Sequence, residues 1–203
     1  MSEETVIETG QVEKKSVLEK FQIQTPEMVI VTLAVAFVGA IIYILLEMIP
    51  IPFAVFGLFK FGLAPALVVI TVVGAIRGPI AGLLTGYLGI LLYDIIISGV
   101  IATFSLYGLA FGVMGFIVGL VKYDMTSGRS LGKMSILSMI GLAFSVLLYA
   151  VFGILVEGIP ILVVMLWQLI TPLTMGLPSV ALLTPLVTRI WYLFMERFKP
   201  DAL

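Results

Sequence analysis

Residues that could do chemistry are scarce in this chain, and the most informative pair lies between positions 77 and 94. Tyr87 and Asp94 are seven residues apart, which places a phenol and a carboxylate on one face of a helix. The residues around them are apolar, and an ionisable side chain in such a segment is a candidate functional group. We expect Asp94 to be a polar anchor for a ligand; the alternative is a hydrated structural acid at a membrane surface.

Further polar or aromatic candidates lie in segments interrupted by proline or glycine. A tryptophan can stack on a ring, an adjacent amide can hydrogen-bond to it, and a lysine can pair with an acid or bind an anionic group. The alternatives are solvated loop acids, a lysine that extends to the membrane surface and an interfacial tryptophan. These substrate-binding candidates, which join Tyr87 and Asp94, are Glu47, Lys60, Glu157, Trp167 and Gln168.

The residue types that are missing exclude most catalytic chemistry. The chain has no cysteine and no histidine, so thiolate chemistry and most transition-metal sites are excluded, and the usual general base is absent. No phosphate-binding loop, nucleophile–base pair or nucleic-acid-binding motif occurs in the sequence. We therefore expect no enzyme activity, no metal and no cofactor, and no nucleic-acid partner.

The composition predicts a membrane protein. Hydrophobic residues make up 61% of the 203 positions and charged residues 11%, against about 25% charged in soluble domains. Long apolar runs recur between positions 26 and 198, after a polar tail over residues 1–25 that is expected to lie in the cytoplasm. The predicted fold is all-α, a polytopic bundle of six transmembrane helices over 26–46, 63–76, 79–97, 101–121, 134–156 and 177–196.

Small residues mark where these helices should meet. Glycines at positions 78, 82, 86 and 89, and again at 108, 112, 115 and 119, form two rows that allow close contact between helix backbones. Ala36 and Ala40 form a small-xxx-small pair on the first helix. This pair could pack within the protein or against a partner protein.

Two apolar segments do not fit regular spanning helices. Residues 47–62 contain Pro50 and Pro52, so we expect an irregular loop that lies on or within the protein. Residues 161–171 are too short to span, and we expect a half-helix at the outer face that stops before Pro172 and Gly176. A seven-span alternative would use residues 161–177 as a further span.

The distribution of basic residues favours six spans over seven. Six spans place ten of the eleven lysines and arginines on one side and leave only Lys60 on the other. The positive-inside rule then puts both termini in the cytoplasm of a multi-pass cell-membrane protein. The ten are Lys14, Lys15, Lys20, Arg77, Lys122, Arg129, Lys133, Arg189, Arg197 and Lys199.

Several pieces of the sequence, taken in order, resemble one family of membrane proteins. They are the apolar proline-containing loop after the first helix, Phe-Lys-Phe-Gly-Leu-Ala-Pro at 59–65, Gly-Pro-Ile-Ala-Gly-Leu-Leu-Thr-Gly at 78–86, and Leu-Pro-Ser at 177–179. Over about residues 27–198 the chain resembles the S components, the substrate-binding membrane subunits, of energy-coupling-factor transporters.

This resemblance implies a function and a set of partners. It implies a vitamin-like ring compound held in an outward-facing pocket, and coupling to a shared transmembrane subunit and two ATPase subunits. It also implies that Ala36 and Ala40 contact the shared subunit. The absence of histidine argues against the cobalt and nickel branch, and no signature for riboflavin, thiamine, biotin or folate is recognised.

Two other functions remain open at this point. One is a non-transporting membrane scaffold of the rod-shape type, which would lack an enclosed outward pocket. The other is a small stand-alone secondary transporter, which would work without an ATPase.

Overall fold

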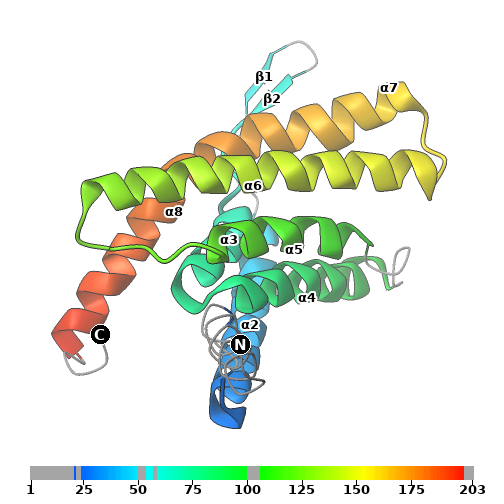
Figure 1. Cartoon of the computed structure of the whole chain (residues 1–203). Coiled ribbons are helices and arrows are strands. Elements are labelled where there is room, and N and C mark those ends of the chain that lie inside the picture. Colours follow the sequence, from blue (N-terminus) through cyan, green and yellow to red (C-terminus); the bar gives the residue numbers. More distant parts are fainter. Residues whose placement is uncertain (1–20, 22–23, 50–53, 57–58, 100–105, 199–203) are drawn as a thin grey trace, which may run out of the picture.

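The structure is a computed structural model that describes residues 21, 24–49, 54–56, 59–99 and 106–198. Most of the predicted tail, both prolines of the predicted loop, and residues 101–105 of the predicted fourth helix lie outside these residues. Within them the chain is almost entirely helical, as Figure 1 shows.

The first described helix, α2 (Pro26–Glu47), begins at a well-formed cap. The Thr25 hydroxyl accepts a hydrogen bond from the Met28 N–H at 3.3 Å, and Pro26 occupies the first turn, where no N–H is needed. This helix agrees with the predicted span at 26–46 to within one residue. Its buried face contains the small residues Thr32, Ala36, Gly39 and Ala40.

Helices α3 (Pro65–Arg77) and α4 (Pro79–Ser98) are joined by a single residue, Gly78. Gly78 has φ of 91°, a backbone conformation that side chains disfavour, and a proline starts each of the two helices. A turn this short brings α4 back alongside α3, so the two helices pack against each other.

Helices α4 and α5 (Leu106–Gly119) make the most extensive contact in the described chain. A Cβ atom built on Gly82 would lie 2.5 Å from the Gly115 carbonyl oxygen, and one on Gly86 would lie 2.7 Å from the Gly112 Cα. The prediction that the two glycine rows allow close backbone contact is therefore confirmed. We call this contact the glycine seam: Gly82 and Gly86 of α4 with Gly108, Gly112 and Gly115 of α5.

The α4 row does not face one neighbour along its whole length. A Cβ atom on Gly89 would lie 2.9 Å from the ring of Tyr43, so this glycine makes room for α2 rather than α5. On the same side of α4, Thr85 donates a hydrogen bond to the Ala36 carbonyl at 3.4 Å. Helix α4 is thus packed between α2 and α5.

The expected half-helix at 161–171 does not stop before Pro172. Helix α6 (Gly128–Leu155) is followed by α7 (Ile161–Val163), the π-helix η2 (Val164–Ile170) and α8 (Thr171–Phe198), and the last three form one continuous segment. The Thr171 hydroxyl donates to the Leu166 carbonyl at 3.0 Å, and the Thr174 hydroxyl donates to the Ile170 carbonyl at 3.1 Å. Pro172 lies in the first turn of α8, directly after the wide π turn, and the two hydroxyls hydrogen-bond to backbone carbonyls about one turn earlier.

This continuity also removes the seven-span alternative. A further crossing would require the chain to reverse between Ile161 and Phe198, and this helical segment contains no turn.

The segment after α2 forms, in its described part, a short hairpin of strands β1 (Ala54–Phe56) and β2 (Phe59–Phe61). The strands are antiparallel, with Val55 opposite Lys60. The expectation that residues 47–62 do not form one regular helix is confirmed. Figure 1 shows the hairpin at one end of the molecule, on the same side as α7.

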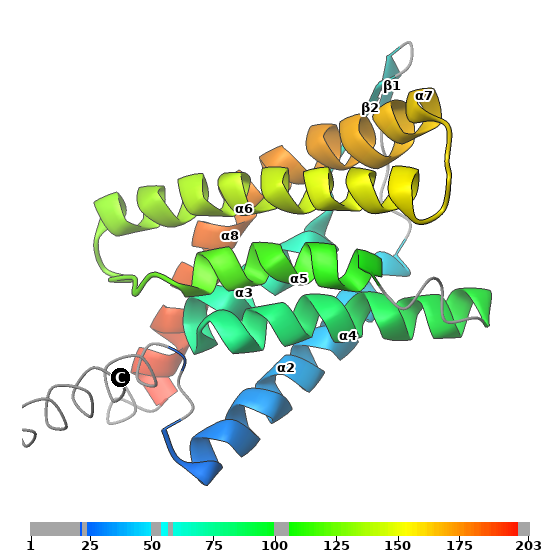
Figure 2. The ribbon, with the colours of Figure 1, turned by 45° about the vertical axis from the view of Figure 1, so that its right-hand side comes forward.

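The helix ends gather at two opposite sides of the bundle (Figure 2). The start of α2, the α3–α4 turn, the α5–α6 connection and the end of α8 lie on one side; the ends of α2, α4 and α6 lie on the other, with the hairpin and α7. Two contacts tie the first side together. The Arg77 guanidinium donates to the Met28 carbonyl at 3.3 Å, and the Arg189 guanidinium donates to the Met125 carbonyl.

Four helical segments in the described part of the chain are long and apolar enough to cross a membrane: Pro26–Glu47, Pro79–Ile97, Gly128–Leu155 and Ile161–Phe198. Helices α3 and α5 are apolar but shorter. The chain is therefore a multi-pass helical membrane protein. Its buried core lies between α2, α3, α4, α5, α6 and α8, around Ile70, Met114, Leu142, Val146 and Val180.

Candidate functional site

Four of the predicted site residues lie at one end of the bundle. Glu47 is the last residue of α2, Asp94 lies one turn before the end of α4, Glu157 follows α6, and Gln168 lies in η2. These helix ends are on the side of the hairpin and α7 in Figure 2. Residues that are far apart in the sequence are therefore brought to one end of the protein by the alternating directions of the helices.

Four tyrosines join these residues into one cluster. The Tyr43 hydroxyl lies within electrostatic range of Glu47, Asp94, Tyr93 and Tyr149. Tyr149 and Tyr107 extend the group to Glu157, and Tyr107 also lies close to Gln168. We call this group the tyrosine–carboxylate cluster; its members are Tyr43, Glu47, Tyr93, Asp94, Tyr107, Tyr149, Glu157 and Gln168.

The aromatic rings of the cluster are arranged at fixed angles above the core. The rings of Tyr107 and Tyr149 are 4.5 Å apart and nearly perpendicular, and Tyr149 also packs on Phe111 at 5.5 Å. Such edge-to-face pairs are favourable and restrict ring rotation. The rings of Tyr107 and Tyr149 are therefore held at a fixed angle to each other.

Several buried polar atoms in this region have no hydrogen-bond partner within the described chain. They include the side-chain oxygen of Gln168 and the hydroxyl of Tyr107, which lies near Glu157 and Gln168 without well-aligned hydrogen-bond geometry. Gln168 is only 7% exposed, so leaving its amide oxygen unpaired costs free energy. Unpaired polar groups beside oriented rings are what a ligand with its own hydrogen-bonding groups would require.

Gly153 of α6 makes room for the Gln168 amide. A Cβ atom at position 153 would collide with all three end atoms of the Gln168 side chain. The inward position of Gln168 therefore depends on a glycine on the facing helix, as well as on the wide turn of η2 that contains it.

The remaining predicted site residues are not brought into the cluster. Trp167 is 58% exposed and points outward, although Gln168 beside it points inward. The backbone of Tyr87 packs against Gly108 of α5, and no described contact joins Tyr87 to the cluster. The backbone of Lys60 pairs with Val55 in the hairpin, and its side chain lies outside the description.

The alanine pair on α2 packs inside the chain. Ala36 and Ala40 are both 0% exposed, and the Ala36 carbonyl accepts the Thr85 hydrogen bond from α4. In this structure their side chains are covered by the protein itself. The surface that α2 offers outward consists of larger neighbours such as Phe37 and Ile41.

The tyrosines of the cluster were not predicted from the sequence, although one spacing indicated them. Tyr43 and Glu47 are four residues apart, a spacing that puts two side chains on one helix face. Tyr107 and Tyr149 carried no comparable signal, because their pairing depends on how α5 packs against α6.

The cluster offers hydrogen-bonding and stacking groups rather than a reaction centre. Its described side chains are phenols, carboxylates and one amide, none of which is paired with a histidine or thiol. Phenols and carboxylates can bind hydroxyl groups, and an amide can both donate and accept. This chemistry suits the reversible binding of a polar ring compound.

Comparison with known proteins identifies the family. The sequence profile of the family described as "ECF-type riboflavin transporter, S component" matches residues 22–191, most of the chain. No solved structure gave a significant match. This match confirms the resemblance to the S components of energy-coupling-factor transporters that the sequence showed. It is a family of substrate-binding membrane subunits for vitamin transport, not of enzymes. The chain belongs to the ECF-type riboflavin transporter S component family.

Proposed function

We propose that this protein is the substrate-binding subunit of an ATP-driven importer and that it binds riboflavin or a closely related flavin at the tyrosine–carboxylate cluster. The observation that carries this proposal is the convergence of four tyrosines, three carboxylates and an inward amide at one end of the bundle. In the proposed topology residues 26–198 form six spans, both termini are cytoplasmic, and the cluster faces outward in the cell membrane.

The chemistry of a flavin matches these groups. Its flat ring system can stack on tyrosine, and stacked aromatic pairs contribute about 0.5–1.5 kcal/mol beyond the burial of their surface. The edge of the ring alternates donors and acceptors, which suits the unpaired amide of Gln168. The hydroxyl-bearing side chain of riboflavin can donate to the carboxylates of Glu47, Asp94 and Glu157.

The energy for transport has to come from other subunits. The sequence has no phosphate-binding loop that would hold ATP. We propose that a transmembrane coupling subunit and two ATPase subunits act with this protein. We propose that the coupling subunit contacts α2, the helix that carries Ala36 and Ala40. The contact would be made by outward residues of this helix such as Phe37 and Ile41.

Fluorescence of the flavin itself tests the binding proposal. Riboflavin should lose fluorescence when the purified protein is added, because the ring stacks on tyrosine. Asp94→Asn should weaken binding about tenfold or more, since a hydrogen bond to a charged group contributes about 1.5–3 kcal/mol. Asp124→Asn is the matched control, because Asp124 lies in the α5–α6 connection at the opposite side of the bundle.

A second variant, at Trp167, tests whether riboflavin binds at the cluster or at a site residue predicted from the sequence that lies outside it. Trp167→Ala should leave riboflavin affinity within about twofold, because that side chain points away from the cluster. If Trp167→Ala weakens binding while Asp94→Asn does not, the cluster is not the binding site. If neither change matters and riboflavin does not bind, the proposed function is wrong.

A transport assay distinguishes an importer subunit from a stand-alone carrier. Vesicles that contain this chain alone should bind riboflavin without accumulating it. Accumulation in such vesicles would contradict the importer proposal and support a secondary transporter.

A further inference from the structure

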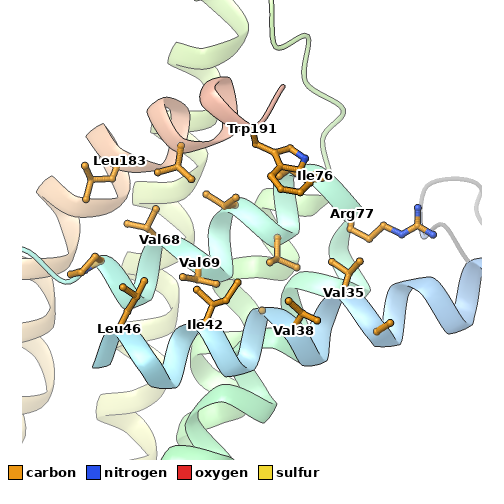
Figure 3. Close-up of a pocket in the computed structure, with 16 residues that line it drawn as sticks. Val35, Val38, Ile42, Leu46, Val68, Val69, Ile76, Arg77, Leu183 and Trp191 are labelled. Atoms are coloured by element: carbon orange, nitrogen blue, oxygen red, sulfur yellow. The ribbon is translucent and has the colours of Figure 1, made fainter. Parts of the chain in front are cut away.

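A groove on the side of the bundle lies apart from the tyrosine–carboxylate cluster. It has a cavity volume of about 570 Å³ and runs between α2, α3 and α8 (Figure 3). We call it the lateral groove. Its lining residues are Ala34, Val35, Val38, Gly39, Ile42, Leu46, Pro65, Val68, Val69, Val72, Val73, Ile76, Arg77, Leu183, Val187 and Trp191.

The lining is apolar except at one end. Among the described lining residues Arg77 is the only charged one, and apart from Trp191 the others are aliphatic or glycine. Side chains at its rim, including Val38 and Val187, are more than 40% exposed. An open apolar groove on a membrane-spanning surface suits a hydrocarbon chain.

The charged end has unmet hydrogen-bonding capacity. Arg77 donates to the Met28 carbonyl through one terminal nitrogen, but its buried Nε has no hydrogen-bond partner. Figure 3 shows Arg77 and Trp191 at the same end of the groove, beside Ile76. A cation and a tryptophan at the end of an apolar path are typical of the headgroup level of a membrane.

The groove is long enough to hold a hydrocarbon chain. Along α2 its lining runs from Ala34 to Leu46, which is about 18 Å at 1.5 Å per residue. Along α3 the lining runs from Pro65 to Arg77, the whole length of that helix. An acyl chain whose headgroup lies at Arg77 would therefore extend through the groove toward the end of α2.

We propose that the lateral groove binds one acyl chain of an anionic phospholipid whose headgroup lies against Arg77. The anionic charge is assigned because the charged residue among the described lining residues is a cation. In the proposed topology Arg77 faces the cytoplasmic leaflet, where anionic lipids supply the surface charge. This binding would not require riboflavin, and the proposal does not rest on the proposed transport function.

Native mass spectrometry with defined lipids tests the proposal. The full-length protein, without flavin, is placed in nanodiscs that contain equal amounts of phosphatidylglycerol and phosphatidylcholine with identical chains. We expect one retained lipid per protein and a preference of about fivefold for phosphatidylglycerol, the effect of one basic residue near a membrane surface. Arg77→Gln should remove that preference, whereas Arg129→Gln, an exposed arginine outside the groove, should keep it.

A second pair of variants tests the apolar part of the groove. Val69→Trp and Val38→Trp should each fill it and lower lipid retention severalfold, while Ile140→Trp on the exposed face of α6 should not. Circular dichroism verifies that each variant is folded, and Val38 is exposed enough to tolerate the change if Val69→Trp does not fold. Equal retention of both lipids, unchanged retention in the folded tryptophan variants, or a protein dimer in place of bound lipid would overturn the proposal.

Discussion

Replacing Gly86 with alanine tests the packing of the glycine seam. A Cβ atom at this position would lie 2.7 Å from the backbone nitrogen and Cα of Gly112 and 3.0 Å from the carbonyl carbon of Phe111. Favourable carbon contacts are about 3.5–4.0 Å long, so α4 and α5 would have to separate by roughly 1 Å. Backbone atoms cannot rotate away, and the separation would loosen the neighbouring contacts of the seam as well.

Two opposing effects set the expected change in the free energy of unfolding of Gly86→Ala. Overpacking typically costs about 1–3 kcal/mol, and the upper part of this range applies because the clashing atoms are backbone. Alanine recovers about 1 kcal/mol of helix propensity. We therefore expect Gly86→Ala to lower the free energy of unfolding by about 1–2 kcal/mol.

Gly132→Ala is the matched control. It introduces the same methyl group into α6 at a position where nothing lies within 4 Å of the new atom, so only the propensity gain remains. Thermal unfolding of the detergent-purified variants, followed by circular dichroism, should show a lower midpoint for Gly86→Ala and an unchanged or higher one for Gly132→Ala. If both variants are at least as stable as the parent protein, the inference of backbone contact in the seam is wrong.

Three further predictions concern other contacts. Gln168→Leu should weaken riboflavin binding in the fluorescence titration while keeping the fold, because it removes the inward amide; unchanged affinity would exclude Gln168 from the site. The hydroxyl oxygens of Thr71 in α3 and Thr184 in α8 are 2.7 Å apart. Replacing both threonines with valine in a double-mutant cycle should show a coupling of about 0.6 kcal/mol in the free energy of unfolding. Additive effects of the two changes would show that this hydrogen bond does not contribute to stability. The hydrogen bonds that Asp124 accepts from Thr126 lower its pKa, so this contact stabilises the fold above the ordinary carboxyl pKa and is lost as the pH falls through the lowered value. NMR titration should show the Asp124 pKa rise toward its ordinary value in Thr126→Ala; an unchanged pKa would contradict this cause.

Sequence patterns predicted the elements with strong local signals. Proline in the first turn indicated where α3 and α4 begin. The glycine rows predicted the close backbone contact between α4 and α5. The prediction that residues 47–62 do not form one regular helix was also confirmed, because the described part of this segment contains the β1–β2 hairpin.

The prediction that a half-helix stops before Pro172 was wrong, because a local signal for a helix end did not decide the structure. A proline such as Pro172 usually interrupts a helix, but here it directly follows a π turn and the helical segment continues through it. The inward position of Gln168 depends on Gly153 of the facing helix α6, a contact that the sequence alone did not predict. Four of the predicted site residues converge, and the tyrosines that join them depend on packing between helices that are distant in sequence.

The glycine seam has a mechanical consequence. Contacts between side chains can rearrange by changing rotamers, but Gly82, Gly86, Gly112 and Gly115 have no rotamers to change. Sliding one helix along the other would drive backbone into backbone within a fraction of a turn. We therefore expect α4 and α5 to move together as one rigid unit, so that any change of shape would involve the contacts of the other helices with this pair.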